Sequence, residues 1–395
     1  MPTKIRSLPI VAAAMLAISA PAAAQSPAAS GGAPPPPPPL PDGWTQVVLG
    51  LDSPRGLAVT SDGTIYVAES GAGGTDSCIE HPELGHLCFG PTSGVSKVSD
   101  GSATRIADGI LSAITATGET FGASAVAVAD DGTVWYTVGG PAAGAAETRA
   151  TITGGEGMGQ LYKIGADGTS TSVADFAAFE SANNPDKDQP GNALPDSNIN
   201  GLILTADGAV VADAGGNDLL LVDDSGAISV LAVFPVTFQP APPDPTASAA
   251  PGASPAMVPM DPVPTSVAVD KDGAYYVGML TGFPFPKGGA TVAKVVKGQD
   301  PTTYATGLTN VEGVAFAPDG SLYVLEISEN GLLSETGLPQ GALLKVPAGG
   351  GTPELVSSGL PMPGGVAVAA DGTVYVSTCA VCPGGGGIAS YTPAS

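Results

Sequence analysis

The chain has 395 residues, among them 56 Gly and 39 Pro, and its formal net charge is −24 at pH 7. Nucleic acids and anionic membrane surfaces carry charge of the same sign, so this balance disfavours both as partners. Gly, Pro, Asp and Asn punctuate short runs of Val, Ile, Thr and Tyr, a composition typical of an all-β protein with many turns.

The N-terminus has the pattern of a secretory signal peptide over residues 1–24. A short basic segment precedes the apolar run Leu8–Ile18, and small residues suited to cleavage come just before Gln25. That run is too short to span a bilayer. A Pro- and Ala-rich linker, extended as polyproline, follows over residues 25–42. We therefore expect a secreted or periplasmic protein, without membrane insertion, whose folded part is 43–395.

Six segments of the folded part share one pattern: a small residue, an apolar run, an Asp-Gly turn and a second apolar run. Gly tolerates positive φ and Asp satisfies the turn, so each segment predicts two antiparallel strands. A repeat of about fifty residues, lengthened by insertions, predicts a six-bladed β-propeller. The turn aspartates are Asp62, Asp131, Asp207, Asp272, Asp319 and Asp371.

The ends of the chain fit a closed ring. The sixth repeat has one outer strand too few, and residues 43–51 precede the first repeat as a spare strand, so we expect the two to pair. Closure removes exposed sheet edges. Three insertions, at 139–159, 179–198 and 239–264, break the spacing; the second reads as structured turns, and the last, rich in Pro and Ala, is expected to be disordered.

The repeat resembles that of NHL-type six-bladed propellers, most clearly over residues 211–222 (VADAGGNDLLLV). Several longer phrases together resemble the ScyD/ScyE family of exported bacterial proteins, over nearly the whole mature chain. This resemblance implies a six-bladed propeller and export, and it implies no particular reaction. The phrases are LDSPRGLAV, the Cys78–Cys88 loop followed by FGPTSGVSKV, ADAGGNDLL, VPTSVAV, LTGFPFPKG and the terminal CAVC.

Strand periodicity predicts which residues surround the mouth of the central channel. The first strands should begin there and the second strands should end there, which gathers carboxylates on one face. Oxygen-rich clusters suit Ca²⁺, and the set also resembles the metal site of gluconolactonase-type propellers. The predicted metal ligands are Glu69, Asn200, Asp213 and Glu312, and the predicted ligand-binding residues on this face are Arg55, Glu69, Asn200, Asp213, Glu312 and Glu326.

A second candidate surface is the Gly-Phe-Pro-Phe-Pro segment that contains Phe283 and Phe285. Two aromatic rings held between prolines are predicted to form an apolar, stacking surface for a ligand at the channel mouth. Packing against the next blade is the alternative.

Four cysteines in an exported chain predict two disulfides. The simplest pairing joins Cys78 to Cys88 and Cys379 to Cys382, and cross-pairing is possible because the first and last blades are neighbours. His81 and His86 lie inside the first loop, so these residues also form a possible zinc set.

Two function classes follow. The first is a binding module, monomeric, that presents one face to a small molecule, a glycan or a protein. The second is a Ca²⁺-dependent hydrolase or lactonase that uses the channel-mouth carboxylates. Both histidines lie in the cysteine loop, so a His general base is not expected at the channel.

Overall fold

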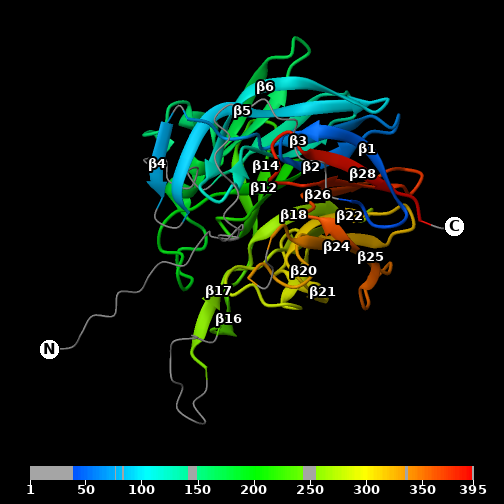
Figure 1. Ribbon diagram of the computed structural model, residues 1–395. Coiled ribbons are helices and arrows are strands. Elements are labelled where there is room, and N and C mark those ends of the chain that lie inside the picture. The colour runs from blue at the N-terminus through cyan, green and yellow to red at the C-terminus, as the bar shows by residue number, and fades with distance from the viewer. Residues whose placement is uncertain are drawn as a thin grey trace.

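The computed structural model describes residues 39–75, 77–81, 84–140, 149–242, 255–333 and 337–393. The predicted signal peptide and linker residues 25–38 lie outside these ranges, and both remain predictions. The described residues form antiparallel sheets almost throughout, as the composition predicts (Figure 1). Among them, no helix is long and apolar enough to cross a membrane.

Six sheets with at least four strands each follow one another along the chain. The first sheet contains β2 (Pro54–Val59), β3 (Ile65–Glu69), β5 (Gly85–Ser99), β6 (Ser102–Thr115) and β7 (Thr120–Phe121), with β4 (Ser77–His81) paired to β5. The second contains β8 (Ala123–Val128), β9 (Val134–Val138), β10 (Gln160–Ile164) and β11 (Ser170–Asp175). The third contains β12 (Ile199–Thr205), β13 (Gly208–Asp213), β14 (Asp218–Val222) and β15 (Ile228–Val233).

The remaining sheets repeat this order. The fourth contains β18 (Pro264–Val269), β19 (Tyr275–Met279), β20 (Ala290–Val295) and β21 (Thr302–Leu308). The fifth contains β22 (Val311–Phe316), β23 (Leu322–Glu326), β24 (Gln340–Val346) and β25 (Glu354–Pro361). The sixth contains β26 (Gly365–Val368), β27 (Val374–Thr378), β28 (Gly386–Tyr391) and, from the other end of the chain, β1 (Trp44–Leu51).

The pairing of β1 with β28 is the one that the spare N-terminal strand predicted. The two strands run antiparallel, with Trp44 opposite Tyr391 and Leu51 opposite Gly386. The indole of Trp44 packs on the Tyr391 ring at 5.5 Å between centroids, and its Nε1–H donates to Ser357 Oγ at 2.9 Å. The N- and C-terminal segments therefore stabilise one shared sheet, which appears as the blue and red strands side by side in Figure 1.

The Asp-Gly turns join the first and second strands of each sheet, as predicted. The turn glycine of the first sheet, Gly63, has φ of 82°, in the region that an L side chain rarely adopts. The carboxylate before it, Asp62 Oδ1, accepts the Thr64 N–H at 3.1 Å, and Asp131 repeats this bond with Thr133 at 2.8 Å. Local chemistry alone thus reverses the chain at these positions.

The first strands surround a crowded axis. Each contacts the first strand of the next sheet, and β26 contacts β2. A Cβ added to Gly365 would lie 2.8 Å from the Arg55 carbonyl oxygen and 2.9 Å from the Gly56 Cα. At Gly201 it would lie 2.8 Å from the Ser266 Cα. The small residues at these positions are therefore required by packing, as the repeat predicts.

The core lies between neighbouring sheets. The second and third strands are buried on both faces, with every residue of β14, β19 and β23 buried. Seven apolar clusters fill the spaces between sheets and beneath the connecting loops. Burial of this apolar surface, at about 25 cal/mol per Å², is the main stabilising contribution to such a fold.

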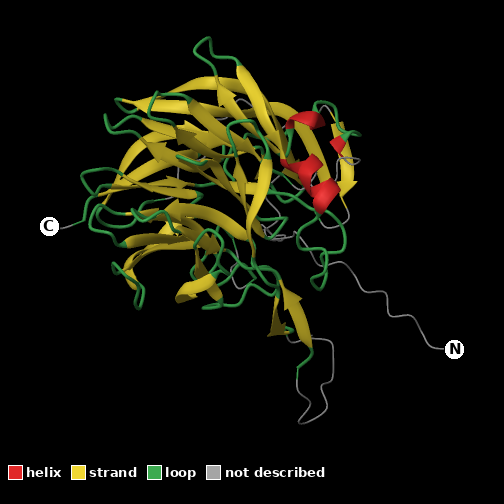
Figure 2. Cartoon of the chain, turned by 180° about the vertical axis from the view of Figure 1, so that it is seen from behind, coloured by secondary structure: helices red, strands yellow, loops and turns green. Residues whose placement is uncertain are grey.

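The insertions differ from their predictions in two places. The connection after β11 contains a helix, α2 (Phe176–Asn183), in place of turns alone, and Asp175 caps it by accepting the Ala178 N–H. The 239–264 insertion begins and ends in a hairpin, β16 (Thr237–Pro240) with β17 (Met257–Met260), which projects as an arm in Figures 1 and 2. A short helical turn, η2 (Gly155–Gly157), lies before β10, and the helices drawn in Figure 2 lie on one side of the molecule.

Candidate functional site

A narrow cavity of about 80 Å³ lies on the axis, lined by residues of all six first strands. The predicted residues Asn200 and Glu312 line it, together with Ser124, Thr265 and Gly364 from the equivalent positions of three other sheets. Arg55 lines an adjoining crevice of about 20 Å³ that also includes Ser124 and Asn200. The predicted ring of strand heads is therefore present, although its cavity has room for only a few water molecules.

The polar centre beside this cavity consists of Arg55, Glu119 and Glu312, which are 5%, 8% and 6% exposed. Arg55 Nη2 donates to the Thr120 carbonyl oxygen at 2.7 Å. Glu119 Oε1 and Glu312 Oε2 are buried and have no hydrogen-bond partner among the described residues. One guanidinium therefore faces two buried carboxyl groups.

The electrostatics of this centre follow from burial. Desolvation raises the pKa of Glu312 to about 8, and the charge of Arg55 only partly opposes it. Desolvation also raises the pKa of Glu119 to about 8, with Arg55 opposing and Glu312 adding. Burial lowers the pKa of Arg55, against the attraction of both acids. Glu312 and Glu119 are therefore largely protonated at neutral pH.

The sequence did not indicate Glu119 as a residue of this centre. It lies in the turn between β6 and β7, in a Thr-Gly-Glu segment that indicates a turn and nothing more. Only the pairing of β7 with β6 brings this turn to Arg55, so no local pattern could have identified it.

The other predicted carboxylates have a different, recurrent role. In three sheets the acid that ends the second strand accepts the backbone N–H of a residue just before the first strand. These pairs are Glu69 with Asp52, Asp213 with Asn198 and Glu326 with Thr309, each at 2.7 Å. The carboxylates thus satisfy buried amides within their own sheets.

Burial raises the pKa of each of these three acids, and two of them accept further hydrogen bonds. Glu69 also accepts the Ser96 hydroxyl and pairs with Arg105 at 3.2 Å; burial is the largest effect on its pKa and raises it. Asp213 accepts the Ser197 hydroxyl at 2.6 Å, and burial raises its pKa as well. Burial raises the pKa of Glu326 to about 7.

These contacts correct the predicted carboxylate ring. None of Glu69, Asp213 and Glu326 lines the axial cavity with Glu312. In the described part of the chain, no three carboxylates bring ligand oxygens within 4.8 Å of one another. The predicted metal set of Glu69, Asn200, Asp213 and Glu312 is therefore not gathered, because backbone amides compete for the strand-end acids.

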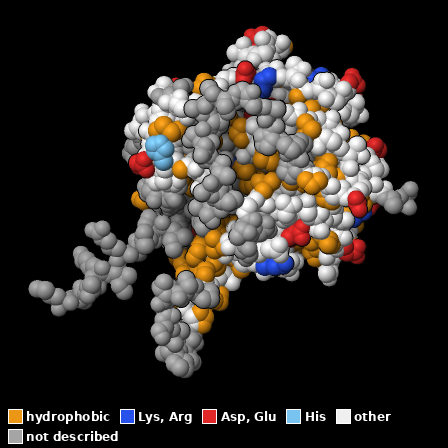
Figure 3. Space-filling view, viewed as in Figure 1, with side chains coloured by type: hydrophobic (Ala, Val, Ile, Leu, Met, Phe, Trp, Pro, Cys, Tyr) orange, Lys and Arg blue, Asp and Glu red, His pale blue; other side chains and the backbone are white. Residues whose placement is uncertain are grey.

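Phe283 and Phe285 belong to an apolar cluster beneath the loops. Phe285 is 2% exposed and packs with Leu280, Ile327 and Met362, while Phe283 is half-buried against the same cluster. The predicted open stacking surface is wrong for Phe285, and packing, the alternative, holds. Over the face seen in Figure 3, hydrophobic side chains gather near the middle and toward the β16–β17 arm, with charged side chains around the rim.

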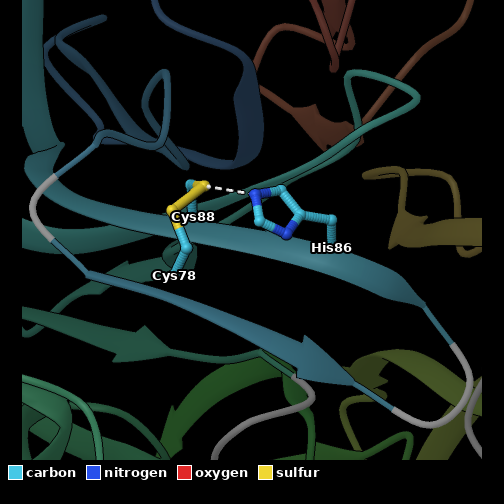
Figure 4. Close-up of side chains that lie close together, drawn as sticks. All are labelled: Cys78, His86 and Cys88. Atoms are coloured by element: carbon cyan, nitrogen blue, oxygen red, sulfur yellow. Dashed lines mark hydrogen bonds between the residues drawn. A yellow bond between two sulfur atoms is a disulfide. The ribbon is translucent and has the colours of Figure 1, made fainter.

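The cysteines pair in the simplest of the predicted ways, Cys78 with Cys88 and Cys379 with Cys382. Cys78 and Cys88 face each other across β4 and β5, and His86 Nε2 lies 3.3 Å from Cys88 Sγ (Figure 4). Both sulfurs are engaged in the disulfide, so they are not thiolate ligands, and His81 instead accepts the Leu84 N–H at 3.3 Å. The zinc set is therefore not formed.

A larger pocket, of about 400 Å³, opens beside this hairpin between the first two sheets. Phe89 and Tyr136, each 1% exposed, line it, and Tyr162 stacks on Tyr136 at 5.2 Å with 13° between the ring planes. Most other lining residues are small or aliphatic: Ser77, Gly90, Pro91, Gly109, Ile110, Leu111, Thr153, Gly154 and Gly157. Sequence analysis missed this pocket.

The fold and its axial ring of strand heads define a β-propeller-like, all-β protein. The chain matches no protein-family model, and no curated protein matches it in sequence. A solved protein of unknown function from Bacteroides thetaiotaomicron is similar in structure, with a TM-score of 0.50, 11% identity, and coverage of 88% of this chain and 75% of that one.

Two solved enzymes are more distant in structure. A streptogramin B lyase has a TM-score of 0.46 and 12% identity, over 88% of this chain and 96% of that one. A gluconolactonase from Xanthomonas campestris has a TM-score of 0.41 and 14% identity, over 91% and 90%. Identities this low carry no information about activity, so the lyase and gluconolactonase activities are properties of the compared proteins alone.

Proposed function

We propose that this protein is a secreted, closed six-bladed β-propeller of the ScyD/ScyE kind, and that it binds a small, uncharged, largely apolar molecule between its first two sheets. Six sheets, first strands in contact around the axis and the β1–β28 pairing support the closed ring. The two disulfides are typical of an oxidising compartment. The apolar run before residue 25 supports export.

The pocket of about 400 Å³ carries the functional part of this proposal. Its volume lies within the roughly 300–1,000 Å³ range of small-molecule sites, which are mostly lined by hydrophobic and aromatic side chains. No described lining residue is charged. An ionic ligand would lose hydration there without gaining a counter-charge, whereas a ring can stack against Tyr162.

Two features hold this pocket in shape. The Cys78–Cys88 disulfide is next in register to the Ser77–Phe89 pair, both of whose members line the pocket. The Tyr162 hydroxyl donates to the Gly157 carbonyl oxygen at 3.1 Å, which holds the η2 turn against β10. Burial raises the pKa of Tyr162 to about 12, so this donor stays protonated at physiological pH. A site held in its bound shape loses less entropy on binding.

The alternative, a metal-dependent hydrolase or lactonase at the axis, has weaker support. Of its four predicted ligands, only Asn200 and Glu312 line the axial cavity. Two side chains supply few of the six to eight oxygens that Ca²⁺ prefers. A cavity of about 80 Å³ also leaves little room for a lactone beside a metal.

Binding can be tested with 2-naphthol, a neutral fused-ring probe, by isothermal titration calorimetry. We expect a single site with a Kd on the order of 0.1 mM, given the affinity per atom of small ligands. Leu111→Trp places a larger side chain in the pocket and should weaken binding at least tenfold.

The matched control is Leu355→Trp, since Leu355 is 65% exposed on β25 and does not line the pocket. This variant should bind 2-naphthol as the wild type does. Equal affinity in both variants, with unchanged far-UV circular dichroism, would contradict binding in this pocket.

A further inference from the structure

A cluster of buried acids lies between the third and fourth sheets, apart from the axis and from the pocket. It comprises Glu180 on α2, Asp186 in the following turn, Asp213 and Asp218 at facing ends of β13 and β14, and Asp261 before β18. Their exposed fractions run from 0% for Asp218 to 7% for Asp261. Among the described residues, no Lys, Arg or His forms an ion pair with any of these five acids.

Three of the five acids are well supplied with hydrogen bonds. Asp213 accepts four backbone and hydroxyl donors. Asp186 Oδ2 and Asp261 Oδ1 share the side-chain amides of Asn192 and Asn217, at 2.5 to 3.3 Å. These two acids are thus drawn together by two neutral donors, which leaves their charges uncompensated.

The other two acids have few donors or none. Among the described residues, both carboxyl oxygens of Asp218 are buried without a hydrogen-bond partner, and Glu180 has only the backbone amide of Asp196. The amide oxygens of Asn184 and Asn192, which are 7% and 2% exposed, also have no donor there. Four oxygen atoms, from Asp218, Asn184 and Asn192, therefore lack a donor. Each such group costs about 1–3 kcal/mol when desolvated, and more if it is charged.

Gly216 lies beside Asp213 and Asp218. A Cβ built on it would make ordinary van der Waals contacts, 3.5 Å from Asp213 Cγ, 3.5 Å from Asp218 Oδ1 and 3.6 Å from the backbone oxygen of Asp196. Side-chain and main-chain oxygens therefore gather around a residue that has no side chain of its own. All the unpartnered atoms are oxygens, which are the ligands of hard divalent cations.

We propose that this acidic cluster binds one Ca²⁺ ion, with Asp218 and Glu180 as its charged ligands. No three described carboxylates converge within 4.8 Å, so two acids at a time would bind the ion, and the Asn184 or Asn192 amide oxygen, backbone oxygens and water would complete its shell. Mg²⁺ demands closer, octahedral ligands and retains its water, so a site of this kind favours Ca²⁺. Ca²⁺ would join α2, the third sheet and the loop before β18.

The acids of the cluster also disfavour one another's charge. Burial raises the pKa of Glu180 to about 9, with Asp213, Asp186 and Asp196 adding and a backbone amide opposing. Burial raises the pKa of Asp218 well above its usual range, with Asp213, Glu180 and Asp186 adding. The charged forms are therefore costly without a counter-charge, which a divalent cation would supply.

The experiment uses the full mature chain, stripped with EDTA and titrated with CaCl₂ by calorimetry at pH 7. We expect one ion per chain and a Kd of about 1 mM or below. Ca²⁺ at a hundred times the Kd should raise the Tm by several degrees, and Mg²⁺ at the same concentration by less.

Asp218→Asn should weaken Ca²⁺ binding at least tenfold, and Glu180→Gln provides a second variant if the first folds poorly. Asp224→Asn is the control, because Asp224 is exposed in the turn after β14 and should leave the titration unchanged. Weak binding of equal affinity in all variants would show only adventitious ions on an acidic surface and would overturn the proposal. Absence of any heat or Tm change up to 10 mM Ca²⁺ would overturn it equally.

Discussion

Replacing Glu312 with Gln tests the buried centre at the axis most directly. Burial raises the pKa of Glu312 to about 8, against the usual 4.5. A carboxyl group whose pKa is higher in the folded state stabilises that state fully below pH 4.5. This contribution is lost as pH rises toward 8, because the unfolded chain gives up the proton first. The amide of Gln has the shape of the protonated acid and does not titrate.

The magnitude follows from the two pKa values. The interval between 4.5 and about 8 corresponds to about 5 kcal/mol, at about 1.4 kcal/mol per pH unit. Glu119 and Arg55 interact with Glu312, so the ionisation of the three groups is coupled. The loss of stability that Glu312 alone causes is therefore smaller than this figure. We expect Glu312→Gln to exceed the wild type in stability by about 2–3 kcal/mol at pH 8, and to lie within about 1 kcal/mol of it at pH 5.

Urea unfolding, followed by far-UV circular dichroism at pH 5, 6, 7 and 8, measures this difference. Glu354→Gln is the control, since Glu354 lies exposed at the start of β25 and should show no pH-dependent gain. If Glu312→Gln is less stable than the wild type by a constant amount at every pH, then Glu312 is ionised in the folded protein and the reasoning fails.

Two further predictions concern the termini and the disulfide hairpin. Trp44→Ala should lower the free energy of unfolding in urea by about 3 kcal/mol, since it removes a 9%-exposed indole and its hydrogen bond to Ser357. Trp44→Phe keeps an aromatic ring and should lower it by about 1 kcal/mol. Similar values for both variants would mean that the ring itself contributes little. Replacing Cys78 and Cys88 together with Ala should lower stability by about 1–3 kcal/mol and weaken 2-naphthol binding several-fold, because the hairpin borders the pocket; unchanged affinity in calorimetry would separate the disulfide from the pocket.

The strands and turns could be predicted from the sequence because their chemistry is local. An Asp-Gly pair reverses the chain wherever it lies, and Gly63 shows the positive φ that this requires. The spare N-terminal strand predicted its pairing with the last strand, and the simplest of the possible cysteine pairings is the one that the structure contains. These features need only neighbours in sequence or a count of strands.

The site could not be predicted in the same way, because its contacts join distant segments. Periodicity correctly placed Asn200 and Glu312 at the axis. It could not show that Glu69 turns toward the backbone amide of Asp52, since that amide competes for the carboxylate only once both strands have paired. Likewise, Glu180 and Asp218 are ordinary acids in the sequence, and only the tertiary packing buries them with few donors or none. Turn chemistry acts over a few residues, whereas burial, which sets the pKa values and creates both candidate binding sites, depends on the whole ring of sheets.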